Sequence, residues 1–351
     1  MYDVILAFIT SFALTYLAIP SIINLAIKKN LFDEPGDRKS HQERTPSLGG
    51  IGIFAGTLFS IILWTPFSYF GDLQYILCAF IIIFLIGAKD DIDPMSPSKK
   101  FLGELFAAGI LVFRANIRLT SLYGFFGIYE IPEIASILLS VFTIIVIINA
   151  FNLIDGINGL SASLGLLITS VLGVWFLLIG SIEIAIVAFS LGGALMAFLK
   201  YNITPAKIFM GDTGALLLGL VCSILAIKFI ELHNDLMNSP YTFRSAPSIA
   251  IAIMILPLFD TLRVFVLRIL EKRSPFSPDR KHIHHIMIDL GLSHMQATGV
   301  LFLINIMFII MAIMLQNMGN FMLLILILAV AWVMSMAAAR MADTKNLNKS
   351  K

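Results

Sequence analysis

Long apolar stretches recur along almost the whole chain and limit the folds that it can adopt. Apolar residues make up 58% of the 351 residues and charged residues only 13%. A helix needs roughly 20 apolar residues to cross a bilayer, and a soluble domain has no use for so many runs of that length. We therefore predict an all-α, polytopic integral membrane protein with about eleven transmembrane helices, near 4–27, 48–66, 73–88, 101–115, 134–151, 160–179, 182–199, 211–230, 248–268, 296–315 and 320–340.

The basic residues fall mainly on alternate connections between these runs. If the N terminus is outside, the inside segments and the C-terminal tail carry 18 of the 24 Lys and Arg residues. Cytoplasmic connections usually carry the excess of Lys and Arg, so this orientation is the one that the positive-inside rule favours. The C terminus is then in the cytoplasm. The net charge of only +2 argues against nucleic acid as a partner. Membrane lipids are the expected surroundings because of the long apolar runs.

No connection is long enough to form a second domain, so we predict one transmembrane domain over residues 1–351. The segments with polar, reactive side chains are all predicted on the cytoplasmic face: 28–50, 89–101, 149–160, 200–214 and 269–295. The alternative is that the polar groups serve an ion-coupled membrane transporter, for which key charges are expected near the middle of the bilayer.

Two adjacent carboxylates, Asp90 and Asp91, follow directly on an apolar run that ends at Ala88. Neighbouring carboxylates repel each other unless a proton or a cation intervenes, and hard oxygen ligands suit Mg²⁺. Lys99 and Lys100 follow in the same segment and suit phosphate oxygens. The alternative is that the two aspartates are solvated or cap the next helix.

Asn149, Asn152 and Asp155 are spaced three residues apart, which places them on approximately one face if the helix continues. They would form a polar wall of a site, or else mark a helix end with turn residues at Gly156 and Gly159.

Two further aspartates lie beside or within apolar runs. Asp212 begins the eighth run, where a carboxylate caps a helix or binds a cation. Asp260 lies inside the ninth run, and Arg263 one turn later is its expected ion-pair partner.

Three of the six histidines, His282, His284 and His285, fall within four positions, just after Arg280 and Lys281. They offer hydrogen-bond donors to a diphosphate, or nitrogen ligands to zinc, although no Cys or second His cluster completes a zinc site. The alternative is a solvated basic loop facing anionic lipid. The same two alternatives, an anionic substrate or anionic lipid, apply to the basic residues of the first inside segment, Arg38, Lys39, His41 and Arg44.

In order along the chain, these segments resemble the polyprenyl-phosphate N-acetylhexosamine-1-phosphate transferase family. The matching elements are Asp33-x-Pro35, Arg38-Lys39-x-His41, Asp90-Asp91, Asn149-x-x-Asn152-x-x-Asp155-Gly156, Gly211-Asp212-x-Gly214 and His282-Ile283-His284-His285. Each element alone is weak, but five segments in order on one predicted face are specific. The form of the histidine motif is similar to that of the WecA-like and TagO-like branch rather than to the related pentapeptide translocases.

The resemblance implies a role for each matching residue. Catalytic roles are implied for Asp90, Asp91, Asp155, His282, His284 and His285, and metal binding for Asp212 with Asp91. Substrate binding is implied for Lys39, His41, Lys100, Asn149 and Asn152. Arg44 and Arg280 are expected to bind substrate as well, because they are basic side chains of the same segments. Two positions depart from the family pattern, because Pro94 and Asn158 stand where many members have carboxylates.

By the same resemblance, the chain is expected to transfer GlcNAc-1-phosphate from a UDP-sugar to undecaprenyl phosphate at a bacterial cytoplasmic membrane, starting a cell-envelope polysaccharide. The alternative within the family is phospho-MurNAc-pentapeptide transfer. The expected cofactor is Mg²⁺, with Mn²⁺ as a substitute. The expected partners are the UDP-sugar donor, the polyprenyl phosphate acceptor, membrane lipids and a second copy in a homodimer.

Overall fold

The structure is a computed structural model that describes all residues except 1, 33–44, 234–235, 237–238, 275–280 and 350–351. Within the described residues it contains α-helices and no named strand, so the prediction of an all-α fold is confirmed. The helices are α1 (Tyr2–Lys29), α2 (Gly49–Trp64), α3 (Leu73–Ile92), α4 (Pro97–Phe113), α5 (Glu133–Ile154), α6 (Leu160–Leu178), α7 (Ile182–Asn202), α8 (Gly211–Leu232), α9 (Ala246–Ile253), α10 (Ile255–Leu270), α11 (Ile283–Asp289), α12 (His294–Met314) and α13 (Asn320–Lys349).

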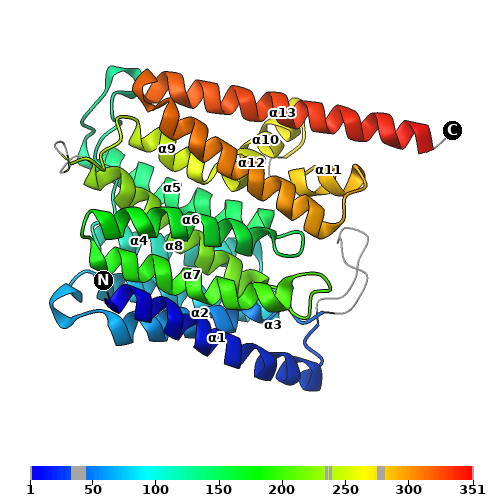
Figure 1. The fold of residues 1–351 in the computed structure, drawn as a ribbon, viewed down its shortest axis with the longest axis horizontal. Coiled ribbons are helices and arrows are strands. Elements are labelled where there is room, and N and C mark those ends of the chain that lie inside the picture. Colours follow the sequence, from blue (N-terminus) through cyan, green and yellow to red (C-terminus); the bar gives the residue numbers. More distant parts are fainter. Residues whose placement is uncertain (1, 33–44, 234–235, 237–238, 275–280, 350–351) are drawn as a thin grey trace.

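The helices form one bundle in which most elements run in roughly the same direction or its reverse (Figure 1). Among the described residues, seven helices are long and apolar enough to cross a membrane, and an eighth is added if α9 and α10 form one bent span. The seven are α1, α5, α6, α7, α8, α12 and α13. The polytopic class is thus confirmed, whereas the count of about eleven spans and their orientation stay predictions.

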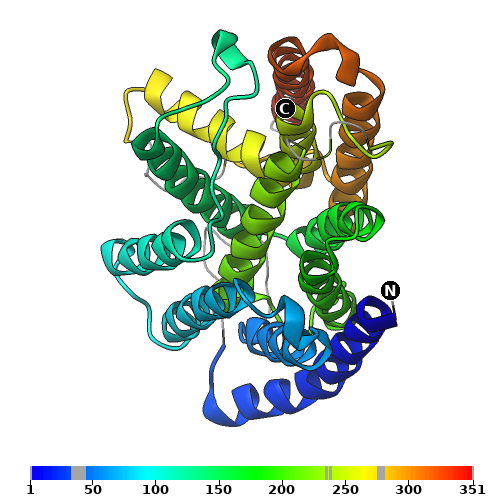
Figure 2. The same cartoon turned by 90° about the vertical axis from the view of Figure 1, so that its left-hand side faces the viewer.

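Helix α8 occupies the centre of the bundle, as the end-on view in Figure 2 shows. Every residue from Thr213 to Ile227 is buried, and α8 packs against α2, α3, α5, α6, α7 and α9. A helix that is apolar on all sides needs neighbours all round it. Its first turn, which carries Asp212, is therefore held in the middle of one end of the bundle.

Glycines allow α2 and α3 to approach this first turn of α8 at backbone contact. A Cβ atom on Gly50 would lie 2.1 Å from the backbone nitrogen of Gly214, and one on Gly87 would lie 2.4 Å from Cα of Thr213. Backbone atoms cannot move aside as a side chain can, so only glycine fits at either position. This close packing brings the end of α3, with Asp90 and Asp91, beside the start of α8.

The prediction of one continuous helix over 248–268 is wrong. The chain breaks at Met254, and the axes of α9 and α10 differ by 83°. Pro257 has no N–H to donate to the carbonyl of Ile253, one turn earlier, and its ring crowds that carbonyl. The side-chain amide of Asn305 in α12 donates to the Ile253 oxygen at 2.9 Å, so the carbonyl freed by the break is satisfied within the protein.

Candidate active site

The predicted site segments meet at a cavity of about 710 Å³ at one end of the bundle. In Figure 1 this is the right-hand end, where α11 and the connection from α7 to α8 lie. Eight residues predicted for the site line the cavity: Asp90, Asp91, Asn152, Asp155, Asp212, His282, His284 and His285. Segments that are far apart in the sequence thus converge on one cavity. Four other predicted site residues, Lys39, His41, Arg44 and Arg280, lie outside the described residues.

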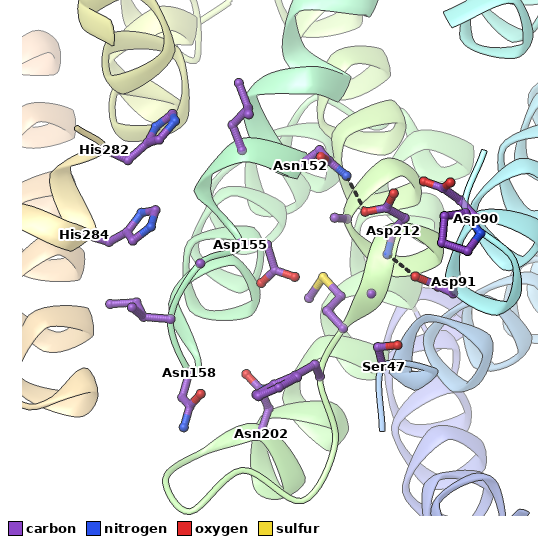
Figure 3. Close-up of a pocket in the computed structure, with 18 of the residues that line it drawn as sticks. Ser47, Asp90, Asp91, Asn152, Asp155, Asn158, Asn202, Asp212, His282 and His284 are labelled. Carbon is purple, nitrogen blue, oxygen red and sulfur yellow. Dashed lines mark hydrogen bonds between the residues drawn. The ribbon is translucent and has the colours of Figure 1, made fainter. Parts of the chain in front are cut away.

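Asp91 binds the N-terminus of α8. One carboxylate oxygen accepts from the backbone N–H of Asp212 at 2.7 Å (Figure 3). The other accepts from the backbone N–H and hydroxyl of Thr213 at 3.0 and 2.5 Å. These are the unpaired donors and the positive end of a helix, which favour a negative charge. Asp91 therefore fixes the position of Asp212, and its own metal binding stays a prediction.

Gly211 makes this contact possible. Its φ angle of +71° lies in the left-handed region, and an added Cβ would lie 2.1 Å from the carbonyl oxygen of Ser47 and 2.7 Å from both carboxylate oxygens of Asp91. The chain can enter α8 at this angle only with glycine at the position.

Asp90 and Asp212 share a single ammonium group. Lys100 Nζ lies 3.2 Å from Asp90 Oδ2 and forms a shorter ion pair with Asp212 Oδ2. The remaining oxygen of Asp212 accepts from the side-chain amide of Asn152 at 2.8 Å, and that of Asp90 accepts from the backbone N–H of Met95 at 2.6 Å. Two carboxylates from α3 and α8 thus converge on one point, where a positive charge already sits.

These oxygen donors suit Mg²⁺, which is usually bound by one or two carboxylates together with waters and substrate phosphates. No group of three or more His, Cys, Asp and Glu side chains that could hold a metal ion occurs within the described part of the chain. The two-carboxylate arrangement of Asp90 and Asp212 fits magnesium with a phosphate substrate, whereas a closed zinc site at the histidines has no support.

Asp155 follows the end of α5 and faces the same cavity. The hydroxyl of Ser161 donates to one of its oxygens. Burial raises the pKa of Asp155 to about 6, the Ser161 hydrogen bond opposes that rise, and the negative charge of Asp212 adds to it. The carboxyl group can therefore gain and lose a proton near neutral pH.

Asn149, predicted to bind substrate, is not among the residues that line the cavity. Its side-chain amide donates to the buried carboxylate of Glu104 in α4 at 2.6 Å and to the Ile145 carbonyl at 3.0 Å. In this structure Asn149 joins α5 to α4. Lys100 is not among the lining residues either, and it pairs with the carboxylates of Asp90 and Asp212.

The histidines form the opposite wall of the cavity. Figure 3 shows the rings of His282 and His284 directed toward the loop that carries Asp155. The two rings are stacked, with centroids 5.7 Å apart. Burial, with a smaller contribution from His285, lowers the pKa of His284 to about 3, so this imidazole is neutral at physiological pH. Gly156 leaves room for the ring, because a Cβ there would lie 2.2 Å from His284 Nε2.

Several cavity residues were not singled out from the sequence. Arg268 is buried and lines the cavity, yet in the sequence it looked like the end of one straight membrane helix. Pro257, which breaks that run, is the signal that could have set Arg268 apart. Asn202 supports the cavity wall: it accepts from the backbone N–H of Gly159 at 2.7 Å and donates to the carbonyl of Ile208 at 2.9 Å. Ser47 also lines the cavity.

Comparison with known proteins identifies the family. Residues 73–230 match the family described as glycosyl transferase family 4. A Bacillus subtilis protein described as a probable undecaprenyl-phosphate N-acetylglucosaminyl 1-phosphate transferase is 34% identical over 320 residues, which cover 90% of this chain and 86% of that protein. The chain belongs to glycosyl transferase family 4.

Two further relatives are similar over most of their length. A decaprenyl-phosphate N-acetylglucosaminephosphotransferase of Mycolicibacterium smegmatis is 31% identical, over 84% of this chain and 78% of that protein. An undecaprenyl-phosphate alpha-N-acetylglucosaminyl 1-phosphate transferase of Salmonella typhi is also 31% identical, over 78% of this chain and 73% of that protein. The predicted family resemblance is confirmed.

Proposed function

We propose that this protein transfers GlcNAc-1-phosphate from UDP-GlcNAc to a polyprenyl phosphate such as undecaprenyl phosphate, giving polyprenyl-diphospho-GlcNAc and UMP. The observation that carries the proposal is the meeting of Asp90, Lys100 and Asp212 at a cavity at one end of an apolar bundle. Relatives described as polyprenyl-phosphate GlcNAc-1-phosphate transferases support the choice of reaction.

The reaction brings two polyanions together, so their repulsion has to be offset. Mg²⁺, or Mn²⁺ in its place, would be held by Asp212 and Asp90 and would neutralise charge on the diphosphate. Arg268 is a buried cation on the cavity wall, and Lys100 supports the two carboxylates from behind. Asp91 keeps Asp212 in place through the N-terminus of α8.

The bond changes follow from the products. An oxygen of the acceptor phosphate forms a bond to the phosphorus that carries GlcNAc, and the bond from that phosphorus to the oxygen of UMP breaks. Any proton that the acceptor phosphate still carries must leave as the new bond forms. We assign Asp155 as its acceptor, because a base with a pKa near 6 matches a phosphate monoester whose second pKa is also about 6.

We expect the rate to fall as the pH is lowered through about 6. Asp155 is ionised above its raised pKa and can accept a proton, whereas below it the carboxyl group is already protonated. In the Asp155→Asn variant the turnover should be lower, and the remaining pH dependence should follow the acceptor phosphate alone. The measurement is kcat against pH from 5 to 8 for both proteins.

The amide oxygen that Asp155→Asn introduces can still accept the Ser161 hydroxyl, so the variant should melt at or above the temperature of the wild type. Identical pH profiles for wild type and variant would remove Asp155 from the role of base.

The membrane setting supplies the acceptor, since the isoprenoid tail of a polyprenyl phosphate dissolves in the same bilayer as the helices. We propose that the cavity faces the cytoplasm, where UDP-sugars are made, and that the protein lies in the bacterial cytoplasmic membrane. The proposal rests on the predicted excess of Lys and Arg on that side.

Exchange of labelled UMP into UDP-GlcNAc tests the reaction in the presence of polyprenyl phosphate. Exchange that depends on the lipid supports the transferase, whereas substrate uptake into vesicles without exchange supports the transporter. Competition among UDP-GlcNAc, UDP-GalNAc and UDP-MurNAc-pentapeptide then identifies the donor. Strong preference for the pentapeptide would replace our choice of donor while leaving the reaction type intact.

A further inference from the structure

Asp260 of α10 is a buried carboxylate that binds the segment carrying the histidines. One oxygen accepts from His282 Nδ1 at 2.8 Å. The other accepts from the backbone N–H of Ile283 at 2.8 Å and from the guanidinium of Arg263 at 3.2 Å. The sequence indicated only the pairing with Arg263, which is one helical turn away.

Arg263 connects the carboxylate of Asp260 to the segment that carries the histidines. Its guanidinium also donates to the backbone carbonyl of Lys281, next to His282. The side chains of Asp260 and Arg263 are only 3% and 6% exposed, so each charge depends on the other for compensation. Arg263 thus places a positive charge beside the carboxylate and connects α10 to the chain just before His282.

The contact with Asp260 determines which nitrogen of His282 carries a proton. An ionised carboxylate can only accept a hydrogen bond, so Nδ1 must be the protonated nitrogen. A carboxylate that accepts from one ring nitrogen in this way fixes both the tautomer and the orientation of the ring.

The second nitrogen of His282, Nε2, opens onto the cavity. His282 lines the cavity. Within the described residues its Nε2 atom has no hydrogen-bond partner, and this atom is not sealed from solvent. The ring of His284 stacks against one of its faces. Both the edge and the face of His282 are thus held in place, and one polar atom is left for a ligand.

We propose that Asp260 is a positioning residue for the transfer reaction: it holds His282 with Nδ1 protonated and directs Nε2 toward the diphosphate-linked sugar of the donor. This inference rests on the proposed function and extends it. The proposed effect of Asp260 on the reaction passes through His282.

A double-mutant cycle tests whether Asp260 acts through His282. We expect Asp260→Asn and His282→Ala each to lower kcat/KM for UDP-GlcNAc by about 10- to 100-fold, the range for loss of a group that orients a histidine. In the His282→Ala background, Asp260→Asn should cause no further loss. Asp289→Asn is the matched control, because Asp289 ends α11 and is exposed, and it should match the wild type.

If Asp260→Asn lowers kcat/KM in the His282→Ala background by the same factor as in the wild type, Asp260 supports the fold or another group. That result would overturn the proposal. A second measurement does not need an Asp260 variant. In protein labelled with ¹⁵N-histidine, the His282 signals, assigned by their absence in His282→Ala, should report a protonated Nδ1. An unprotonated Nδ1 would contradict the proposal even if all Asp260 variants failed to fold.

The two proposals fail in different ways. If wild-type protein forms no lipid-linked sugar, the proposed function is wrong, whatever the state of His282. If the wild type is active but the double-mutant cycle is additive, only the role of Asp260 is wrong.

Discussion

Replacing Asp212 by asparagine is expected to abolish formation of the lipid-linked sugar. Asp212 accepts from Asn152 and pairs with Lys100, and its carboxylate is one of the two that we propose to hold Mg²⁺. An amide would lose the negative charge and would turn one acceptor into a donor facing other donors. Loss of several kcal/mol of charge stabilisation in the transition state lowers the rate by on the order of 1,000-fold or more.

The measurement is product formation at several Mg²⁺ concentrations with purified protein in detergent. The fold should persist, because Asp91 binds the backbone N–H of residue 212 and not its side chain. Asp72→Asn is the control, since Asp72 is exposed and directly precedes α3, at the end opposite Asp90 and Asp91. Full Mg²⁺-dependent activity in Asp212→Asn would exclude Asp212 from the metal site.

Gly211→Ala is expected to lower both stability and activity. The left-handed φ of +71° costs an alanine about 1 to 2 kcal/mol. The new Cβ would also meet the Ser47 carbonyl and the Asp91 carboxylate, and such overpacking costs about 1 to 3 kcal/mol more. Relief of that contact would move Asp91 away from the N-terminus of α8, and Asp212 with it.

Gly180 offers a matched control for this substitution. Its φ is +83°, but an added Cβ would meet nothing within 4 Å. Gly180→Ala should therefore show only the backbone cost and keep full turnover, while Gly211→Ala shows a larger fall in melting temperature and a loss of turnover. Equal effects at the two glycines would mean that the contact with Ser47 and Asp91 does not hold the site together.

The positions of the helices could be predicted from the sequence because the apolar runs are long and are separated by polar segments. Ten of the eleven runs each coincide with one helix in the structure, and the run at 248–268 coincides with the bent pair α9 and α10. The gathering of Asp90, Asp155, Asp212 and the histidines could be predicted as well, since successive spans return polar connections to the same end of a bundle. Orientation relative to the membrane still rests on the distribution of basic residues.

Contacts between distant helices could not be predicted in the same way. Asp91 looked like a metal ligand, but its hydrogen bonds to α8 depend on the close approach at Gly87 and Gly211. Asn149 shares a face with Asn152 only approximately, and the structure turns it toward Glu104 on a neighbouring helix. Sequence spacing alone says nothing about which of two neighbouring faces meets a cavity.

The role of Asp260 shows the same limit. Arg263 was identifiable as a partner because it lies one turn away on the same helix. His282 is 22 positions away in sequence and lies just before α11, so no periodicity along α10 shows that it contacts Asp260. Helical spacing predicts the ion pair of Asp260 with Arg263, but it cannot predict the contact of Asp260 with His282.

The central claim is that the sugar moves together with its phosphate. UDP-GlcNAc labelled with ³²P at the phosphorus that carries the sugar distinguishes this transfer from transfer of the sugar alone. With polyprenyl phosphate and Mg²⁺, we predict that the ³²P appears in the lipid and that unlabelled UMP is released. Label that remains in released UDP, or that never enters the lipid with active, folded protein, would contradict the claim.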